Sequence, residues 1–371
     1  KGFGGMANPI KLNDLYSRVA SLLSKAIGRR LTSVECCLLI DEAAVTIVAG
    51  NIRRSAGMRQ FSSDDIDAAT AKENLWSQDK EGNWRIDPEK DALRMANHTR
   101  VYHSKPSYQT ILEAVTKQFN SGEGAIQFAP EAIARSNADI LNKDELRKEF
   151  IEIYSEQGKD EAKYWINHNF GPFSNDELNH RMTRYGLNPC GEILGNDFHC
   201  NLAEVHLNQI DPNNLEEQKK AFKSAALSVA CLLNHKFEVE RYRVSREFDP
   251  IVGVSFTGLF DFFVHAFGTS WLRWWEQGRP DTEEGKLFKE RESKYLESWK
   301  IIVKETVWDY CDKHNLRRPN RCTTVQPAGT KSLLTGAAPG WHPPKAQRFI
   351  RRITFRKNDP VALACMDYGY S

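Results

Sequence analysis

The sequence predicts an α/β fold. Short runs that alternate apolar and polar residues, such as 202–207, are typical of strands, and longer stretches with apolar residues at helical spacing lie between them. Alternation of strands with helices favours α/β architecture. The chain has 371 residues, which is long for one ordinary domain but within the range of a single α/β barrel. We find no internal repeat or clear linker that would divide it.

Helix signals can be followed along the chain. Segment 62–65 has the serines and aspartates of a helix cap, and 120–122 (Asn-Ser-Gly) is typical of a helix end. Residues 142–182 are strongly charged, so we expect solvent-facing helices there with no chemistry. The remaining helices are expected at 12–27, 34–48, 108–119, from the turn at 211–214 to about 233, and through 296–311.

Composition excludes several classes of protein. Lysine and arginine number 51 against 49 aspartates and glutamates, so no large field attracts a nucleic acid or an anionic membrane. No apolar run approaches the roughly 20 residues needed to cross a bilayer, and no signal peptide is recognisable, so we expect a cytoplasmic protein. Eight irregularly spaced cysteines predict reduced thiols, so a cysteine pair here is more typical of catalysis than of structure.

The most informative stretch is 188–202, Asn-Pro-Cys-Gly-Glu-Ile-Leu-Gly-Asn-Asp-Phe-His-Cys-Asn-Leu. Asn188-Pro189 predicts a turn, which places Cys190 on a loop. Gly191 leaves room beside the thiol for a ligand. If the loop is extended, the side chains of Asn188, Cys190 and Glu192 share one face and can meet one small substrate.

The second informative stretch is 323–334, Thr-Thr-Val-Gln-Pro-Ala-Gly-Thr-Lys-Ser-Leu-Leu. A strand-like run leads through proline and glycine to an expected helix start, a layout that offers backbone N–H groups and a positive dipole end to an anion. Lys331-Ser332 is like the end of a Walker phosphate loop, but Val325 and Thr330 stand where that loop requires glycine. We therefore exclude an ATPase of that type and expect phosphate binding.

Five motifs give the chain its resemblance to the ribonucleotide reductases, and to the monomeric, adenosylcobalamin-dependent class II enzymes in particular. They occur in the same order and span nearly the whole chain. The motifs are Gly2-Phe3-Gly4-Gly5, Gly50-Asn51-Ile52-Arg53-Arg54-Ser55-Ala56, Asn188-Pro189-Cys190-Gly191-Glu192, Phe198-His199-Cys200-Asn201-Leu202 and Gln326-Pro327-Ala328-Gly329-Thr330.

The resemblance implies a ten-stranded α/β barrel of the ribonucleotide reductase and glycyl radical enzyme type. Residues 1–371 would form part of this single catalytic domain, with N-terminal and C-terminal regions of the full protein missing. A finger loop at about 186–196 would cross the barrel and carry Cys190 as a thiyl radical, which adenosylcobalamin would generate. The implied activity is reduction of ribonucleoside triphosphates to deoxyribonucleotides for DNA synthesis.

The resemblance also implies roles for single residues. Cys190 would remove the ribose 3′ hydrogen, Glu192 would act as general base on the 3′ hydroxyl, and Asn188 would hold the ribose hydroxyls. Cys200 would be one of two thiols that reduce the sugar, and its partner would precede residue 1. The thioredoxin-linked cysteine pair of the C-terminus is absent here, because only Cys365 follows the phosphate motif.

Two nucleotide-binding segments follow from the same resemblance. A loop at about 325–333 would hold the substrate's phosphates, through Pro327, Ala328, Gly329, Thr330 and Ser332. A deoxynucleotide effector would bind a specificity loop that includes Asn51, Arg53, Arg54 and Ser55. We expect a monomer with no nucleic acid, membrane or metal partner.

Less specific interpretations stay open. The cysteines could merely pack in a non-catalytic nucleotide-binding fragment, or a separate metal subunit could generate the radical. A metal site formed by Cys190, His199, Cys200 and His206 is weaker, because that spacing fits no usual ligand set. The aromatic group Trp271, Trp274 and Trp275 is more typical of a core than of a docking surface.

Overall fold

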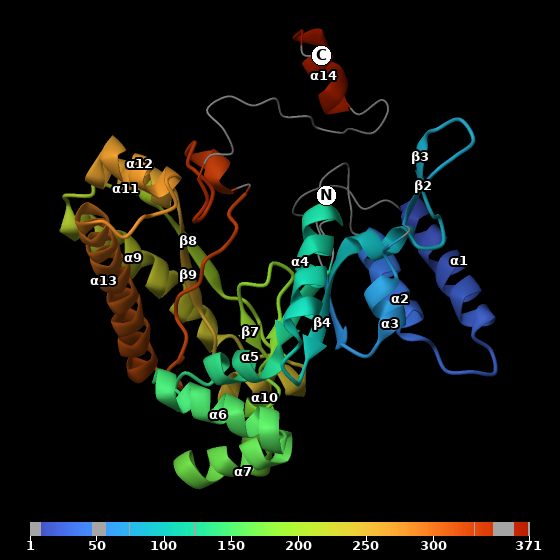
Figure 1. Ribbon diagram of the computed structural model, residues 1–371, viewed down its shortest axis with the longest axis horizontal. Coiled ribbons are helices and arrows are strands. Elements are labelled where there is room, and N and C mark those ends of the chain that lie inside the picture. Colours follow the sequence, from blue (N-terminus) through green and yellow to red (C-terminus); the bar gives the residue numbers. More distant parts are fainter. Residues whose placement is uncertain are drawn as a thin grey trace. The chain divides into compact units, whose positions relative to one another are not determined.

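The computed structural model describes residues 9–46, 57–73, 75–121, 124–329, 331–343 and 360–369 (Figure 1). The chain divides into two compact units, the first comprising Lys1–Ala129 with Ile350–Ser371 and the second Pro130–Phe349. In the described part of the chain no helix combines the length and apolar character needed to span a membrane.

The first unit contains a small parallel sheet. Its helices are α1 (Pro9–Lys25), α2 (Ser33–Thr46), α3 (Ile66–Thr70), α4 (Tyr108–Ser121), α14 (Pro360–Asp367) and the 3-10 helix η1 (Asp91–Met95). Its strands are β1 (Gly57–Ser62), β2 (Trp76–Gln78), β3 (Trp84–Ile86), β4 (Ala96–Tyr102) and β5 (Ala125–Phe128).

Strands β1, β4 and β5 pair in parallel in the order β1-β4-β5, whereas β2 and β3 form a separate antiparallel hairpin. Cys37 and Leu38 of α2 pack with Ala71, Ala92 and Leu93 in the buried cluster of this unit. The helices expected at 12–27, 34–48 and 108–119 are confirmed to within a few residues. The cap expected before α3 is confirmed as well, since the Asp65 side chain accepts a hydrogen bond from the Ala68 amide.

The second unit contains the informative stretches 188–202 and 323–334. Its helices are α5 (Ala129–Ser136), α6 (Asp144–Gln157), α7 (Lys159–Phe170), α8 (Asn175–Arg181), α9 (Leu215–Ala230), α10 (Glu240–Phe248), α11 (Leu259–Phe267), α12 (Thr269–Glu276), α13 (Glu283–Lys313) and the 3-10 helices η2 (Leu207–Gln209), η3 (Cys231–Asn234) and η4 (Lys331–Leu334). Its strands are β6 (Gly186–Leu187), β7 (Leu194–Gly195), β8 (Leu202–His206) and β9 (Gly253–Thr257).

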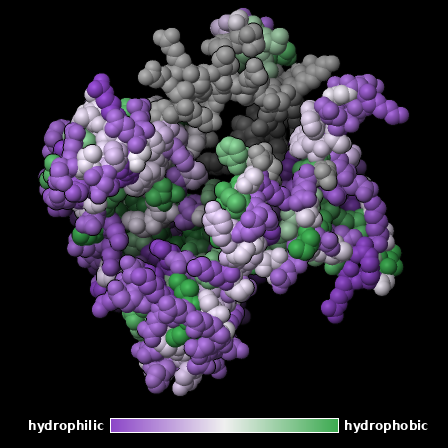
Figure 2. Space-filling model, in the orientation of Figure 1, coloured by the Kyte–Doolittle hydropathy of each residue, from purple (hydrophilic) through white to green (hydrophobic). Residues whose placement is uncertain are grey.

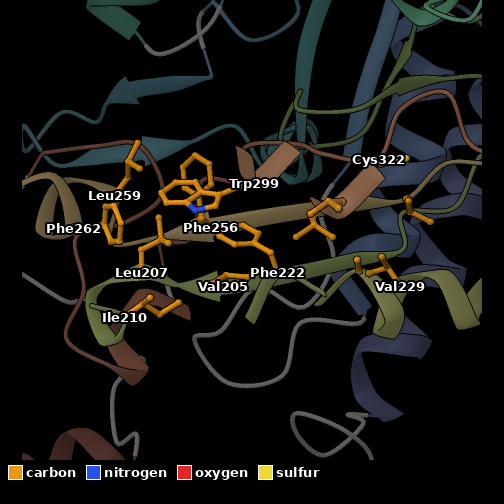
Figure 3. Packing of buried hydrophobic residues seen from close by; sticks show 14 of the residues in the cluster. Val205, Leu207, Ile210, Phe222, Val229, Phe256, Leu259, Phe262, Trp299 and Cys322 are labelled. Carbon is orange, nitrogen blue, oxygen red and sulfur yellow. The ribbon is translucent and has the colours of Figure 1, made fainter. Parts of the chain in front are cut away.

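A parallel pair of strands forms the centre of this unit. β8 pairs with β9 from Leu202↔Gly253 to His206↔Thr257, and every residue of β9 is buried. Helices α9 and α13 lie side by side and cover the pair (Figure 1). Figure 3 shows the core between them, where Phe222 of α9 stacks on Trp299 of α13 at 5.0 Å. This core fixes β8, and therefore the segment that carries Cys200.

The prediction of a purely solvated face at 142–182 is wrong in part. Hydrophilic residues do dominate the surface over α6 and α7 (Figure 2). The inner faces of these helices, however, form a second core in which Phe150 and Ile166 are fully buried. Arg181, at the end of α8, is only 1% exposed. The sequence did not reveal this core, because charged residues predominate in 142–182 and the apolar residues that form the core are few.

Candidate active site

Cys190 lies at the tip of a short hairpin. Strands β6 and β7 pair antiparallel, and residues 188–193 connect them. The Gly191 amide donates to the Asn188 carbonyl at 2.9 Å, and Gly191 has a φ of 76°, a conformation that glycine adopts without strain. The turn predicted from Asn188-Pro189, with Cys190 on a loop, is confirmed, and the condition of an extended loop is not met, because the chain turns here. The Cys190 side chain is exposed at this turn.

Asn188 closes the loop. Its side-chain Oδ1 accepts a hydrogen bond from the Ile193 amide at 3.1 Å, and its own amide donates to the Ile193 carbonyl at 3.3 Å. Asn188 is buried, at 9% exposure. The side chain thus has a structural task that the sequence did not suggest, because one lone pair of its Oδ1 is used within the loop.

Glu192 has an unsatisfied oxygen. Its Oε2 atom is buried and has no hydrogen-bond partner among the described residues. Its backbone carbonyl, in contrast, accepts a hydrogen bond from the Thr324 hydroxyl at 3.0 Å. A buried carboxylate oxygen without a donor costs about 1–3 kcal/mol or more, so this oxygen is suited to accept a proton or hydrogen bond from a ligand.

Cys200 lies near Cys190 and Glu192. It precedes β8, which is held by its pairing with β9. Burial, together with smaller contributions from the nearby Glu192 and Cys190, raises the pKa of the Cys200 thiol to about 11. The side chain still has substantial solvent exposure. Two thiols and a carboxylate therefore influence one another electrostatically, so the structure does bring these predicted residues together.

We expect alkylation of the Cys200 thiol to be slow. With a pKa of about 11, only about 0.1% of it is thiolate at pH 8, and the thiolate is the reactive form. Mass spectrometry of iodoacetamide labelling between pH 7 and 10 should show Cys200 lagging behind the exposed Cys231. Glu192→Gln removes one charge that raises the Cys200 pKa and should speed its labelling. Equal rates for Cys200 in both proteins would contradict the proximity of Glu192.

His199 packs among aromatic side chains. Its ring stacks on Phe237 at 4.2 Å and meets the edge of Tyr242 at 4.8 Å. His206 instead contacts the Thr335 hydroxyl at 2.7 Å. Within the described residues no cluster of three or more histidine, cysteine or carboxylate side chains is arranged to hold a metal.

The segment before the phosphate motif runs beside β9. Thr323 forms a parallel bridge with Val254, whose amide donates to the Cys322 carbonyl at 3.0 Å. The backbone amide of Gln326 then donates to the Ser255 hydroxyl at 2.9 Å. The expected strand is thus reduced to one bridge, which lies at the edge of β9. Thr324 in this segment is the residue that holds Glu192.

The phosphate motif ends in a single 3-10 turn, η4, and not in a longer helix. The Ser332 amide already donates to the Ala328 carbonyl at 3.1 Å, so any helix-dipole contribution is small. Ala328, at a φ of 50°, and Ser332 are buried, whereas Pro327 and Gly329 are exposed. Thr330 lies outside the described residues, as do the specificity-loop residues Asn51, Arg53, Arg54 and Ser55 and the motif at 2–5.

A buried ionic network holds the base of the hairpin, and the sequence did not predict it. Arg184 is fully buried, donates to Asn137 Oδ1 and to the Phe248 carbonyl, each at 3.1 Å, and lies 3.5 Å from Asp249. Burial lowers the Arg184 pKa to about 10. Arg321 also pairs with Asp249 and donates to the Leu194 carbonyl of β7.

Glu204 is a second residue that the sequence analysis missed. It is two positions beyond Leu202 and four beyond Cys200, a spacing at which side chains on a strand share a face. Its side chain is 4% exposed, and Oε2 lies 2.8 Å from Lys331 Nζ. The alternation along 202–207 was the signal that could have placed Glu204 on the same face as Cys200, although it does not reveal the pairing with Lys331.

Comparison with solved structures defines the fold. A B12-dependent (class II) ribonucleotide reductase matches with a TM-score of 0.61 and 20% sequence identity, over 92% of this chain and 41% of that one. The chain therefore has an incomplete α/β fold of the class II ribonucleotide reductase type, as the motifs predicted. No protein-family model matches it.

Sequence comparison with curated proteins gives the same result as the comparison of folds. Adenosylcobalamin-dependent ribonucleoside-triphosphate reductases of Levilactobacillus brevis, Lactobacillus gasseri and Lacticaseibacillus paracasei are 27%, 28% and 28% identical to the chain over its whole length. The chain spans 44% of the length of these relatives. The resemblance to this group of reductases is thus confirmed along the entire sequence.

Proposed function

We propose that this chain forms the radical-bearing part of an adenosylcobalamin-dependent ribonucleoside-triphosphate reductase. The observation that carries the proposal is the grouping of Cys190, Glu192 and Cys200, with the Glu192 carbonyl held by Thr324 beside the phosphate motif. Named relatives with this activity match the whole chain, which supports the assignment.

The residues present fit the cofactor. Its chemistry, when it is bound, is to supply a carbon radical that removes a hydrogen atom from a thiol. Cys190 has the required thiol, exposed at a turn tip, with Gly191 leaving open space next to it. The Cys190 sulfur would then take the 3′ hydrogen from the ribose of the substrate and return a hydrogen atom at the end of turnover.

Glu192 would accept the proton of the 3′ hydroxyl as a general base. Its Oε2 atom is buried and lacks a partner among the described residues, which suits a general base that gains its hydrogen bond from the substrate. Asn188, through Nδ2, would donate to a ribose oxygen, because its Oδ1 is engaged by Ile193.

Cys200 would supply reducing power. Replacing the 2′ hydroxyl by hydrogen, with release of water, requires two electrons and two protons, and two thiols that become a disulfide provide both. The raised pKa of Cys200 keeps it protonated near neutral pH, as a proton donor requires. We propose that the second thiol is not among the motifs identified in this chain. The same holds for the cysteine pair that would take electrons from thioredoxin.

The remaining assignments complete the proposal. The loop at 325–333 would hold the phosphates of a ribonucleoside triphosphate, and a deoxynucleotide effector would bind near Arg53 and Arg54. We infer a monomeric cytoplasmic enzyme that needs no separate metal subunit.

The experiment measures deoxyribonucleotide formation by the full-length protein with a dithiol reductant. We expect product only when adenosylcobalamin is added, together with a paramagnetic signal from a thiyl coupled to cobalt. Product without cobalamin, or only with a second subunit, would refute the proposed radical source. Nucleotide binding with no product under any radical source would favour a non-catalytic nucleotide-binding protein.

A further inference from the structure

The phosphate motif contains an ion pair that reduces its positive charge. Lys331 Nζ lies 2.8 Å from Glu204 Oε2 and also donates to Gln326 Oε1. Glu204 Oε1 has no hydrogen-bond donor within the described residues, and the group that faces Oε2 is the Lys331 ammonium. The amide nitrogen Nε2 of Gln326 is likewise buried without a partner in that part of the chain.

The two partners differ in their exposure to solvent. The Glu204 side chain is 4% exposed and that of Lys331 is 47% exposed. When the pair separates, the half-exposed ammonium group is solvated and loses little, whereas the buried carboxylate is left without its counter-ion, so most of the free-energy cost falls on Glu204. Glu204 therefore stays in place, and Lys331 is the partner that can exchange one anion for another.

We propose that Glu204 is a specificity-determining residue that sets how strongly the phosphate loop attracts polyphosphate charge. It neutralises Lys331, so a nucleotide must compete with a fixed carboxylate for the ammonium group. The number of phosphate charges on the nucleotide then decides the outcome of that competition. This inference rests on the proposed function, because it takes the loop at 325–333 as the phosphate site.

The test measures binding of CTP and CDP to the full-length protein by calorimetry. Glu204→Gln removes the competing charge, so CTP should bind about fivefold more tightly, the amount expected for one partly exposed ion pair. CDP should gain less, and the CTP affinity should depend more steeply on salt concentration. The gain should vanish in a Glu204→Gln, Lys331→Met double variant.

Lys331→Met alone provides a second measurement that does not depend on how well Glu204→Gln folds. Because Glu204 already neutralises the lysine, this variant should weaken CTP binding less than about threefold. Lys289→Met serves as the matched control, since Lys289 forms an exposed pair with Asp281 at 3.3 Å on α13. It should leave both affinities unchanged.

Each outcome separates this inference from the proposed function. Unchanged or weaker CTP binding in Glu204→Gln, or a gain that persists in the double variant, would overturn the role of Glu204 but leave reductase activity possible. A loss above about tenfold in Lys331→Met would also overturn it, because Lys331 would then already serve the phosphates. Absence of cobalamin-dependent reduction in the wild type would refute the proposed function itself.

Discussion

Replacing Cys190 by alanine in the full-length protein is expected to abolish nucleotide reduction, by at least about three to four orders of magnitude. A methyl group cannot give up a hydrogen atom as a thiol does, so no sulfur would be available to attack the sugar. Nucleotide affinity should remain near the wild-type value, because the phosphate motif is untouched. Turnover measured by product formation, and binding measured by calorimetry, separate the two effects.

Cys231→Ala is the matched control. Cys231 is also exposed and lies in the same unit, but its Sγ contacts only the nearby Ser228 carbonyl at 3.1 Å among the contacts described for it. Activity should be preserved in this variant. Substantial reduction by the Cys190→Ala protein would refute the radical role of Cys190 and with it the proposed enzyme.

The largest effect on stability is expected for Arg184→Met. The substitution removes the guanidinium group that bonds Asn137 and faces Asp249, both of which are buried. Removing one partner of a buried ion pair costs about 3–5 kcal/mol, and among the described residues only Arg321 would remain paired with Asp249. Urea denaturation followed by circular dichroism gives the free energy of unfolding of both proteins.

Arg243→Met provides the comparison, because Arg243 is 49% exposed and pairs with Glu240 and Glu247 on the surface of α10. Its loss should change the free energy of unfolding by less than about 1 kcal/mol. If Arg184→Met is equally mild, Arg321 alone must compensate Asp249. In that case the network does not hold the hairpin base in the way described.

The sequence predicted much of the fold because local patterns determined it. The apolar spacing of 296–311 identified α13, and the alternation of 202–207 identified β8. The tryptophans at 271 and 274 are buried in the core, as expected. These elements depend on residues close together in the sequence, and their side chains face one continuous apolar cluster.

The site was predicted in composition but not in geometry. Glu192 and Cys200 were identified from motifs and the turn from Asn188-Pro189, yet the hydrogen bond from the Ile193 amide to Asn188 Oδ1 that closes the loop is not revealed by any residue pattern. Partners distant in the sequence were missed for the same reason. Arg184 meets Asp249 and Glu204 meets Lys331 only after the chain has folded, and charged residues alone favour a solvent-facing interpretation.

The Thr324 hydroxyl that bonds to the Glu192 carbonyl has a consequence for timing. Thr324 lies three residues before Pro327, so under the proposed function a nucleotide bound at 325–333 would restrain the hairpin tip through this hydrogen bond. The reactive sulfur would be held still only while a substrate is present. An unpaired electron would then have a sugar within reach before any stray reductant or oxygen could quench it.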